Sequence, residues 1–268
     1  MGMGGSTVVV GWPLGVALVA LVLLAVAASL VGRLGTGRAT AVAAARAAVQ
    51  LAAVATVILA VVRSWWATAL FVLVMVGVAT WTSARRMTGG RSGWNAGLAI
   101  LGGSLPVVAV VLVSGAVPLT GIAVVPIAGI VIGGAMSATS VAGRRALDQL
   151  ETRRGEYEAA LSLGFLPRDA ALLVVRGSAT DALVPALDQT RTVGLVTLPG
   201  AFVGVLLGSG DPVRAGAAQV LVLIGLLAAE TIAVLTAVEL VARGRIRRDE
   251  PVPRPTLRER LRAGGRTR

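Results

Sequence analysis

Few side chains in this sequence have the chemistry of a catalytic or metal-binding group. The chain of 268 residues contains no cysteine and no histidine, which excludes thiolate and imidazole ligands and any nucleophile–base pair built from them. Any metal must therefore meet oxygen ligands or a methionine thioether. All 25 basic residues are arginine, so the lysine that a Walker A loop needs to reach nucleotide phosphates is missing. We expect a chain that is no enzyme and binds no cofactor, and any linked ATP hydrolysis must come from a partner.

Glu230 is the one carboxylate deep inside a long apolar segment. An ionisable group at that depth costs about 2.5–3.5 kcal/mol on insertion scales, so it usually faces a bundle interior or a wet path. It could bind a cation or carry a proton, but we favour a protonated or paired glutamate that joins helices, because one carboxylate makes a poor cation site. Arg46 and Gln50 lie one turn apart on one helix face. They could line the path or pair with Glu230, or Arg46 could snorkel to the interface.

The elements that must position these residues are membrane-spanning helices. Hydrophobic residues make up 56% of the chain and the mean hydropathy is +0.84, whereas soluble domains are about 45–50% apolar. Apolar runs of about 17–25 residues can cross a bilayer. They predict an all-α membrane protein, a polytopic bundle of about seven transmembrane helices with a helical cytoplasmic coupling loop. We place the spans at residues 8–31, 39–62, 65–83, 96–114, 119–142, 192–208 and 215–241.

The arginine content alternates between the connections, which fits a single orientation. Arginines are frequent after the first, third, fifth and seventh runs and scarce after the others. We expect a multi-pass protein of the plasma (inner) membrane with its N-terminus outside and its C-terminus in the cytoplasm. The net charge of +12 then reflects anchoring to the lipid bilayer. We expect no nucleic-acid binding, because no basic patch is interleaved with aromatic stacking residues.

The connection at residues 143–191 is longer than the others and carries helical patterns. Apolar residues at helical spacing predict an amphipathic helix that Gly164 ends, and Pro167 can stand in the first turn of a second helix. In the largest cytoplasmic loop, such a helix–break–helix indicates a docking element. We divide the chain into a transmembrane domain at residues 1–242, which includes this connection, and a basic cytoplasmic tail at residues 243–268, which we expect to be disordered.

Proline and glycine residues interrupt two of the predicted spans. Pro126, Gly134 and Met136 fall in the fifth run, where glycines at four-residue spacing favour close helix packing. Met136 could offer a thioether, although methionine in an apolar helix is usually a space filler. Pro199 and Gly200 interrupt the sixth run, and the freed backbone groups need partners or water. Such a break marks a substrate path or hinge, or a static kink, and both remain open.

One short motif resembles a known coupling element. Glu158-Ala159-Ala160, with Gly164 four residues later, resembles the Glu-Ala-Ala-x-x-x-Gly core of the coupling loop in ABC transporter permeases. Most of the chain is similar to the FetB-type iron-export ABC permease family, whose plant relatives are linked to aluminium tolerance. The stretches that carry this resemblance are Arg46-x-x-x-Gln50-Leu51, Val125-Pro-Ile-Ala-Gly129, Gly134-Ala-Met136, Leu161-Ser-Leu-Gly164, Thr192-Val-Gly-Leu-Val-Thr-Leu-Pro-Gly200 and Asp211-Pro212.

The resemblance implies a permease subunit that pairs with a separate ABC ATP-binding subunit, dimerises to build one pore and exports metal ions, in bacteria iron. A nucleotide sugar or another small solute is an alternative cargo, since such a cargo has been attached to plant members. Two other classes compete. A secondary carrier driven by ion gradients predicts clustered intramembrane carboxylates and an inverted repeat. A membrane enzyme acting on lipid or prenyl substrates predicts paired acids or metal ligands at the membrane face.

Overall fold

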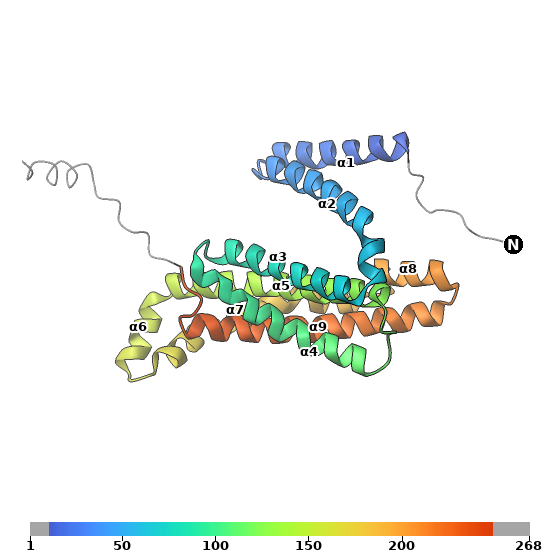
Figure 1. Cartoon of the computed structure of the whole chain (residues 1–268). Helices are drawn as coiled ribbons and strands as arrows, with labels where there is room; N and C mark the ends of the chain where they lie inside the picture. Colours follow the sequence, from blue (N-terminus) through green and yellow to red (C-terminus); the bar gives the residue numbers. More distant parts are fainter. Residues whose placement is uncertain (1–10, 249–268) are drawn as a thin grey trace, which may run out of the picture. The chain divides into compact units, whose positions relative to one another are not determined.

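The computed structural model describes residues 11–248, and over that range the chain forms α-helices joined by short connections (Figure 1). Residues 249–268, most of the predicted tail, lie outside the described residues. The chain divides into two compact units, one ending at Arg63 and one beginning at Ser64. The described helices are α1 (Trp12–Val31), α2 (Gly37–Arg63), α3 (Trp65–Met87), η1 (Arg91–Asn95), α4 (Ala96–Val113), α5 (Gly121–Thr152), α6 (Arg154–Ser162), α7 (Pro167–Thr192), α8 (Gly200–Ser209) and α9 (Pro212–Ala242).

Seven of the described helices are long and apolar enough to cross a membrane, which confirms the predicted all-α bundle. Six of them coincide with predicted spans. The prediction of a spanning helix at residues 192–208 is wrong, because residues 193–199 are not helical and α8 has only 10 residues, about 15 Å of helix. The seventh long helix is α7, with 26 residues. It takes up part of the segment 143–191, so only residues 153–166 of that segment lie outside α5 and α7.

The first unit is a hairpin of α1 and α2. Its turn is held by Ser29 and Thr36, whose hydroxyl oxygens lie 2.9 Å apart, and the Thr36 N–H also donates to Ser29 Oγ at 3.2 Å. The apolar side chains of α2 are largely exposed. This suits a hairpin whose surrounding solvent is lipid rather than water.

The second unit is built around α5 and α9, with α3, α4 and α7 packed against this pair and successive long helices antiparallel (Figure 1). Helices in lipid approach closely where their facing residues are small. Alanines supply the small surfaces here, and the fully buried ones include Ala135 and Ala142 of α5 and Ala229, Ala233 and Ala237 of α9. The tight contact between α5 and α9 positions the groups described next.

Candidate functional site

The arginine-bearing helix ends of the second unit come together at one end, here called the Arg-rich end. Arg168 at the start of α7 donates two hydrogen bonds to the carboxylate of Glu239 near the end of α9, at 2.6 and 2.9 Å. Arg248 pairs with Asp148 and Glu151 in the last turns of α5. These pairs tie the end of α5, the start of α7 and the end of α9 into one charged surface.

α6 projects from the Arg-rich end (Figure 1) and carries the predicted coupling motif. Its first turns are braced by ion pairs from Arg153 to Glu156 and from Arg154 to Glu158. The hydrogen bond from Arg153 lowers the pKa of Glu156, and the same bond raises the pKa of Arg153. Arg153 also donates to the Val174 carbonyl at 3.3 Å, so the start of α6 is attached to α7.

The turn after α6 forms where the sequence predicted it. α6 ends at Ser162, and Pro167 stands in the first turn of α7. Gly164 has a φ of +91°, a left-handed conformation that costs residues with a side chain about 1–2 kcal/mol. Among the predicted coupling residues, Ala160 is buried, whereas Glu158, Ala159 and Gly164 are exposed.

Three large apolar side chains are exposed on this turn. Leu163, Phe165 and Leu166 are 79%, 48% and 68% exposed, and we call them the apolar tip. Exposed apolar patches rimmed by polar residues mark sites of interaction with another protein or with a membrane. The Glu-Ala-Ala-x-x-x-Gly motif does not include these three residues. The sequence did contain a signal for them, because they are large apolar residues next to Gly164 in a segment rich in charged residues.

Residues 193–199, between α7 and α8, leave the helical path. Gly194 has a φ of +81° and its N–H donates to the Thr197 carbonyl at 2.9 Å, which makes a tight turn. Leu195 and Val196 are 90% and 79% exposed. Pro199 directly precedes α8 and Gly200 is its first residue. The two residues therefore begin a helix and do not kink a continuous one, which was one of the two alternatives that the sequence left open.

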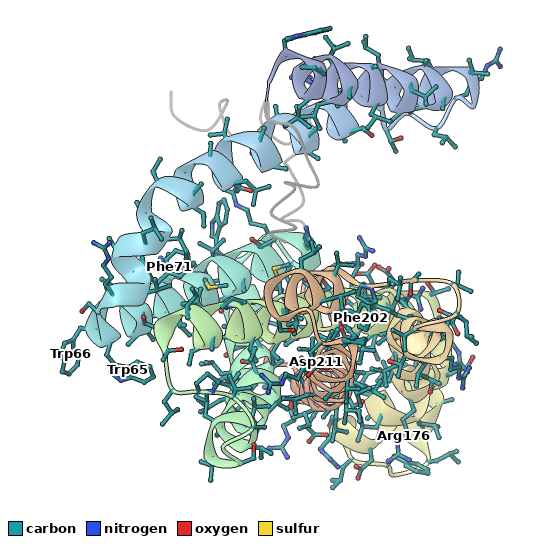
Figure 2. All side chains as sticks on the ribbon, turned by 90° about the vertical axis from the view of Figure 1, so that its right-hand side faces the viewer. Trp65, Trp66, Phe71, Arg176, Phe202 and Asp211 are labelled. Carbon is teal, nitrogen blue, oxygen red and sulfur yellow. The ribbon has the colours of Figure 1, made fainter. Side chains whose placement is uncertain are left out.

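A hydrogen bond to Gln219 of α9 shows how far the break at residues 193–199 lies from the start of α9. The buried Gln219 side chain accepts a hydrogen bond from the Phe202 N–H at 3.1 Å through Oε1, and Figure 2 labels Phe202 in α8 and Asp211 at the start of α9. Gln219 lies about 10 Å along α9 from Pro212, so α8 folds back beside α9 and the break is deeper than the α9 start. Non-helical backbone at membrane depth is tolerated only where protein or water covers it. Sequence reasoning missed Gln219, although a glutamine in an apolar run was visible.

Glu230 and Gly134 meet where α9 crosses α5. A Cβ added to Gly134 would lie 2.7 Å from Glu230 Oε1 and 2.2 Å from Leu226 Cδ1, so side chains of α9 already fill this space. Within the second unit, over residues 64–248, the Glu230 carboxylate has no hydrogen-bond or ion-pair partner, and among the described residues no three Asp or Glu side chains cluster as a metal site.

The other predicted path residues are spread over different elements. Pro126 is exposed near the start of α5. Met136 is half-buried against α3, and its carbonyl accepts hydrogen bonds from the hydroxyls of Ser83 and Ser140. Arg46 and Gln50 are exposed on α2 of the first unit. Pairing of Arg46 with Glu230 would join the two units and stays a prediction.

Seven helices that are long and apolar enough to cross a membrane define a polytopic α-helical membrane protein, and its second unit carries the Arg-rich end, the exposed apolar tip and the helix break. The chain belongs to the uncharacterised protein family UPF0014, which matches residues 13–246. This confirms the predicted family resemblance.

Three curated proteins illustrate the relationship. UPF0014 membrane protein STAR2 of Oryza sativa subsp. japonica is 34% identical over 220 residues, 81% of this chain and 77% of that protein. Protein ALUMINUM SENSITIVE 3 of Arabidopsis thaliana is 34% identical over 169 residues, 63% of this chain and 62% of that protein. Probable iron export permease protein FetB of Escherichia coli (strain K12) is 33% identical over 146 residues, 54% of this chain and 56% of that protein. No solved structure matches the chain.

Proposed function

We propose that the chain is the membrane-spanning permease subunit of an ABC transporter that exports metal ions, with iron as the cargo. In this proposal a separate ATP-binding subunit hydrolyses ATP, two copies of the chain form the pore, and the plasma membrane holds them with the N-terminus outside and the C-terminus in the cytoplasm. The observation that carries the proposal is the apolar tip, formed by Leu163, Phe165 and Leu166, which stands exposed at the Arg-rich end.

The position of the apolar tip supports docking to a soluble partner. Arginine-rich segments favour the cytoplasmic side of a membrane, where ATP-binding subunits operate. Exposed leucine and phenylalanine side chains are unfavourable in water and become favourable once a protein groove covers them. The chain contains no lysine for a Walker A loop of its own.

The contacts around α6 give a route from the partner to the membrane. Arg153 attaches the start of α6 to the Val174 carbonyl of α7, and Arg168 attaches the start of α7 to Glu239 of α9. A displacement of α6 would therefore move α7 and α9 together. α7 leads to the break at residues 193–199, and α9 lies beside α8, which follows the break, through the hydrogen bond from the Phe202 N–H to Gln219. In the proposed cycle this displacement changes the shape of the break and opens the path to the outside.

The break also offers ligands for a cation. Backbone carbonyls in an unwound segment and the negative end of a half-helix coordinate cations in other transporters. In this proposal the ligands are backbone carbonyls at the end of α7 and in residues 193–198, together with the hydroxyls of Thr192 and Thr197. Oxygen ligands are what a chain without cysteine or histidine can supply to iron. The name of the FetB relative, a probable iron export permease, supports the cargo and the direction.

The test is to replace apolar residues of the tip with charged ones. We expect Phe165→Glu combined with Leu166→Glu to abolish co-purification of the ATP-binding subunit and to raise the iron content of cells that depend on the chain for export. Thr152→Glu, which adds a charge at an exposed position outside the tip, is the matched control and should leave both unchanged. Iron transport by the purified chain in vesicles without any nucleotide-hydrolysing subunit would refute the proposal.

A further inference from the structure

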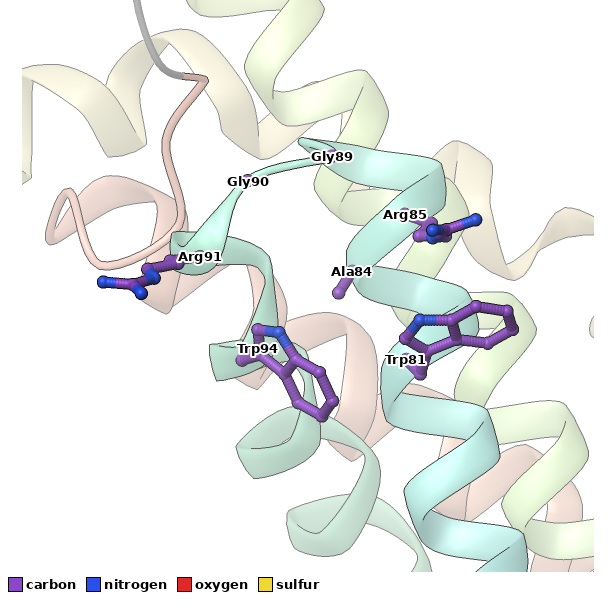
Figure 3. Close-up of a pocket in the computed structure, with 7 residues that line it drawn as sticks. All are labelled: Trp81, Ala84, Arg85, Gly89, Gly90, Arg91 and Trp94. Carbon is purple, nitrogen blue, oxygen red and sulfur yellow. The ribbon is translucent and has the colours of Figure 1, made fainter.

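A hollow of about 380 Å³ opens at the Arg-rich end between the end of α3 and η1. Figure 3 shows Trp81 and Trp94 on its two sides with Ala84 between them, and the guanidinium groups of Arg85 and Arg91 at its outer edges. The Gly89–Gly90 turn closes it at the end where α3 stops. Trp81 and Trp94 are 46% and 55% exposed, so the hollow is open to the surroundings.

Residue spacing along α3 places this hollow at the membrane–water interface. The 19 residues from Trp66 to Arg85 correspond to about 29 Å of helix, which matches a hydrocarbon core of about 30 Å. Trp65 and Trp66 point outward at the opposite end of α3 (Figure 2). Tryptophans are enriched at both interfaces of a membrane, so Trp81 and Trp94 lie where lipid headgroups meet the acyl chains.

Two positive charges of the hollow lack an anionic partner. The guanidinium of Arg85 lies 4.7 Å from the centre of the Trp81 ring, an arrangement that orients the cation without neutralising it. Neither Arg85 nor Arg91 forms an ion pair with the part of the chain that the structure describes, whereas Arg153, Arg168 and Arg248 at the same end do. An anion from outside the chain would neutralise the positive charges of Arg85 and Arg91.

We propose that this hollow is a phosphate-binding site whose occupant is the headgroup of an anionic phospholipid. The two guanidinium groups stand at opposite edges of the hollow (Figure 3), and both attract an anion to its mouth. A phospholipid uses the whole site, because its acyl chains lie against the indole rings and its negative headgroup lies at the mouth between the arginines. Basic pockets between helices on the cytoplasmic side bind anionic headgroups in this manner.

The test measures lipid binding by native mass spectrometry of the purified full chain in detergent. Phosphatidylglycerol and phosphatidylcholine with identical acyl chains are titrated separately, and inorganic phosphate is added to the phosphatidylglycerol complex. We expect selective retention of phosphatidylglycerol that equimolar inorganic phosphate does not displace. Arg85→Gln and Arg91→Gln should each weaken this binding about fivefold, the effect of one arginine near an anionic headgroup.

Arg86→Gln is the matched control, because Arg86 is an exposed neighbour that does not line the hollow. It should change phosphatidylglycerol binding less than twofold, and Trp94→Leu should weaken the binding although it removes no charge. If Arg86→Gln weakened phosphatidylglycerol binding as much as Arg85→Gln does, the lipid would be attracted by the charged surface in general, and the assignment of a specific site would be wrong. Equal binding of both lipids, or displacement by equimolar phosphate, would overturn the lipid assignment. Circular dichroism of each variant verifies that the helices are retained.

Discussion

Gly103 of α4 lies against the backbone of α9 at Ala229. A Cβ added to Gly103 would stand 2.4 Å from the Ala229 carbonyl oxygen and 3.2 Å from the Ala233 nitrogen. Neither backbone atom can move unless the two helices separate. Among the glycines of the described residues, Gly103 is the one whose added Cβ would come nearest to a backbone atom of another helix.

Gly103→Ala should therefore destabilise the protein by about 1–3 kcal/mol, the usual cost of overpacking a tight interface. Gly133→Ala in α5 is the control, since a Cβ there meets nothing within 4 Å and alanine favours a helix by up to about 1 kcal/mol. Thermal unfolding in detergent, followed by circular dichroism, measures both. Equal midpoints for the two variants would contradict the close contact of α4 with α9.

Glu230→Gln tests whether the carboxyl group of Glu230 has a structural role or carries protons or binds cations. Glutamine keeps the shape that fills the space over Gly134, and it cannot ionise. We expect the variant to keep transport within about twofold and to keep the wild-type dependence on pH, because one carboxylate makes a poor cation site. Iron efflux from cells loaded at several pH values is the measurement. A loss of efflux in a well-folded variant would place Glu230 in the translocation path.

Arg168→Gln should lower transport more than it lowers stability. The Arg168–Glu239 pair is partly exposed, and such pairs contribute about 0–1 kcal/mol to folding. In the proposed mechanism the pair transmits motion from α6 to α9. Arg145→Gln is a matched control. Arg145 likewise links two helices, in its case α5 and α7 through Asp181, and both arginine side chains are 45% exposed. ATPase-coupled iron efflux, set against the unfolding midpoint, should drop severalfold for Arg168→Gln alone.

Gly164 offers a comparison of two substitutions with the same backbone strain. Its φ of +91° strains any other residue, and a Cβ there meets nothing within 4 Å. Gly164→Ala and Gly164→Trp should lose similar stability, about 1–2 kcal/mol. Only the indole of Gly164→Trp obstructs the surface beside the apolar tip, so it should reduce ATPase-coupled transport much further. Full coupling in Gly164→Trp would show that this turn does not dock.

Hydropathy predicted the number of long helices but misplaced one of them, for reasons visible in particular residues. The sequence predicted the helix that starts at Pro167 but not that it is long enough to span a membrane, because Arg176 and Asp181 interrupt its apolar pattern. The pairing of Asp181 with Arg145 of α5 becomes apparent only from the structure. Residues 192–208 are more apolar, yet Gly194 and Pro199 stop helical continuity there.

The candidate coupling turn was more predictable than the membrane interior. Gly164 and Pro167 act through their own backbone conformations, which are local properties of the residue type, and the structure places a helix end and a helix start where they predicted. The environments of Glu230 and Gln219 depend on neighbours more than 15 residues away in sequence, such as Gly134 and Phe202. No pattern within one helix could reveal those contacts.

The length of α5 has a mechanical consequence. Its 32 residues run without interruption from Gly121 to Thr152 and measure about 48 Å, whereas a hydrocarbon core is about 30 Å thick. α5 is therefore several turns longer than a helix that crosses this core along the membrane normal. Its one internal proline, Pro126, lies near the opposite end, so no proline interrupts the turns that lead to Thr152. In the proposed mechanism, a force applied near Thr152 would therefore be transmitted along one continuous helix to the membrane-spanning part of α5.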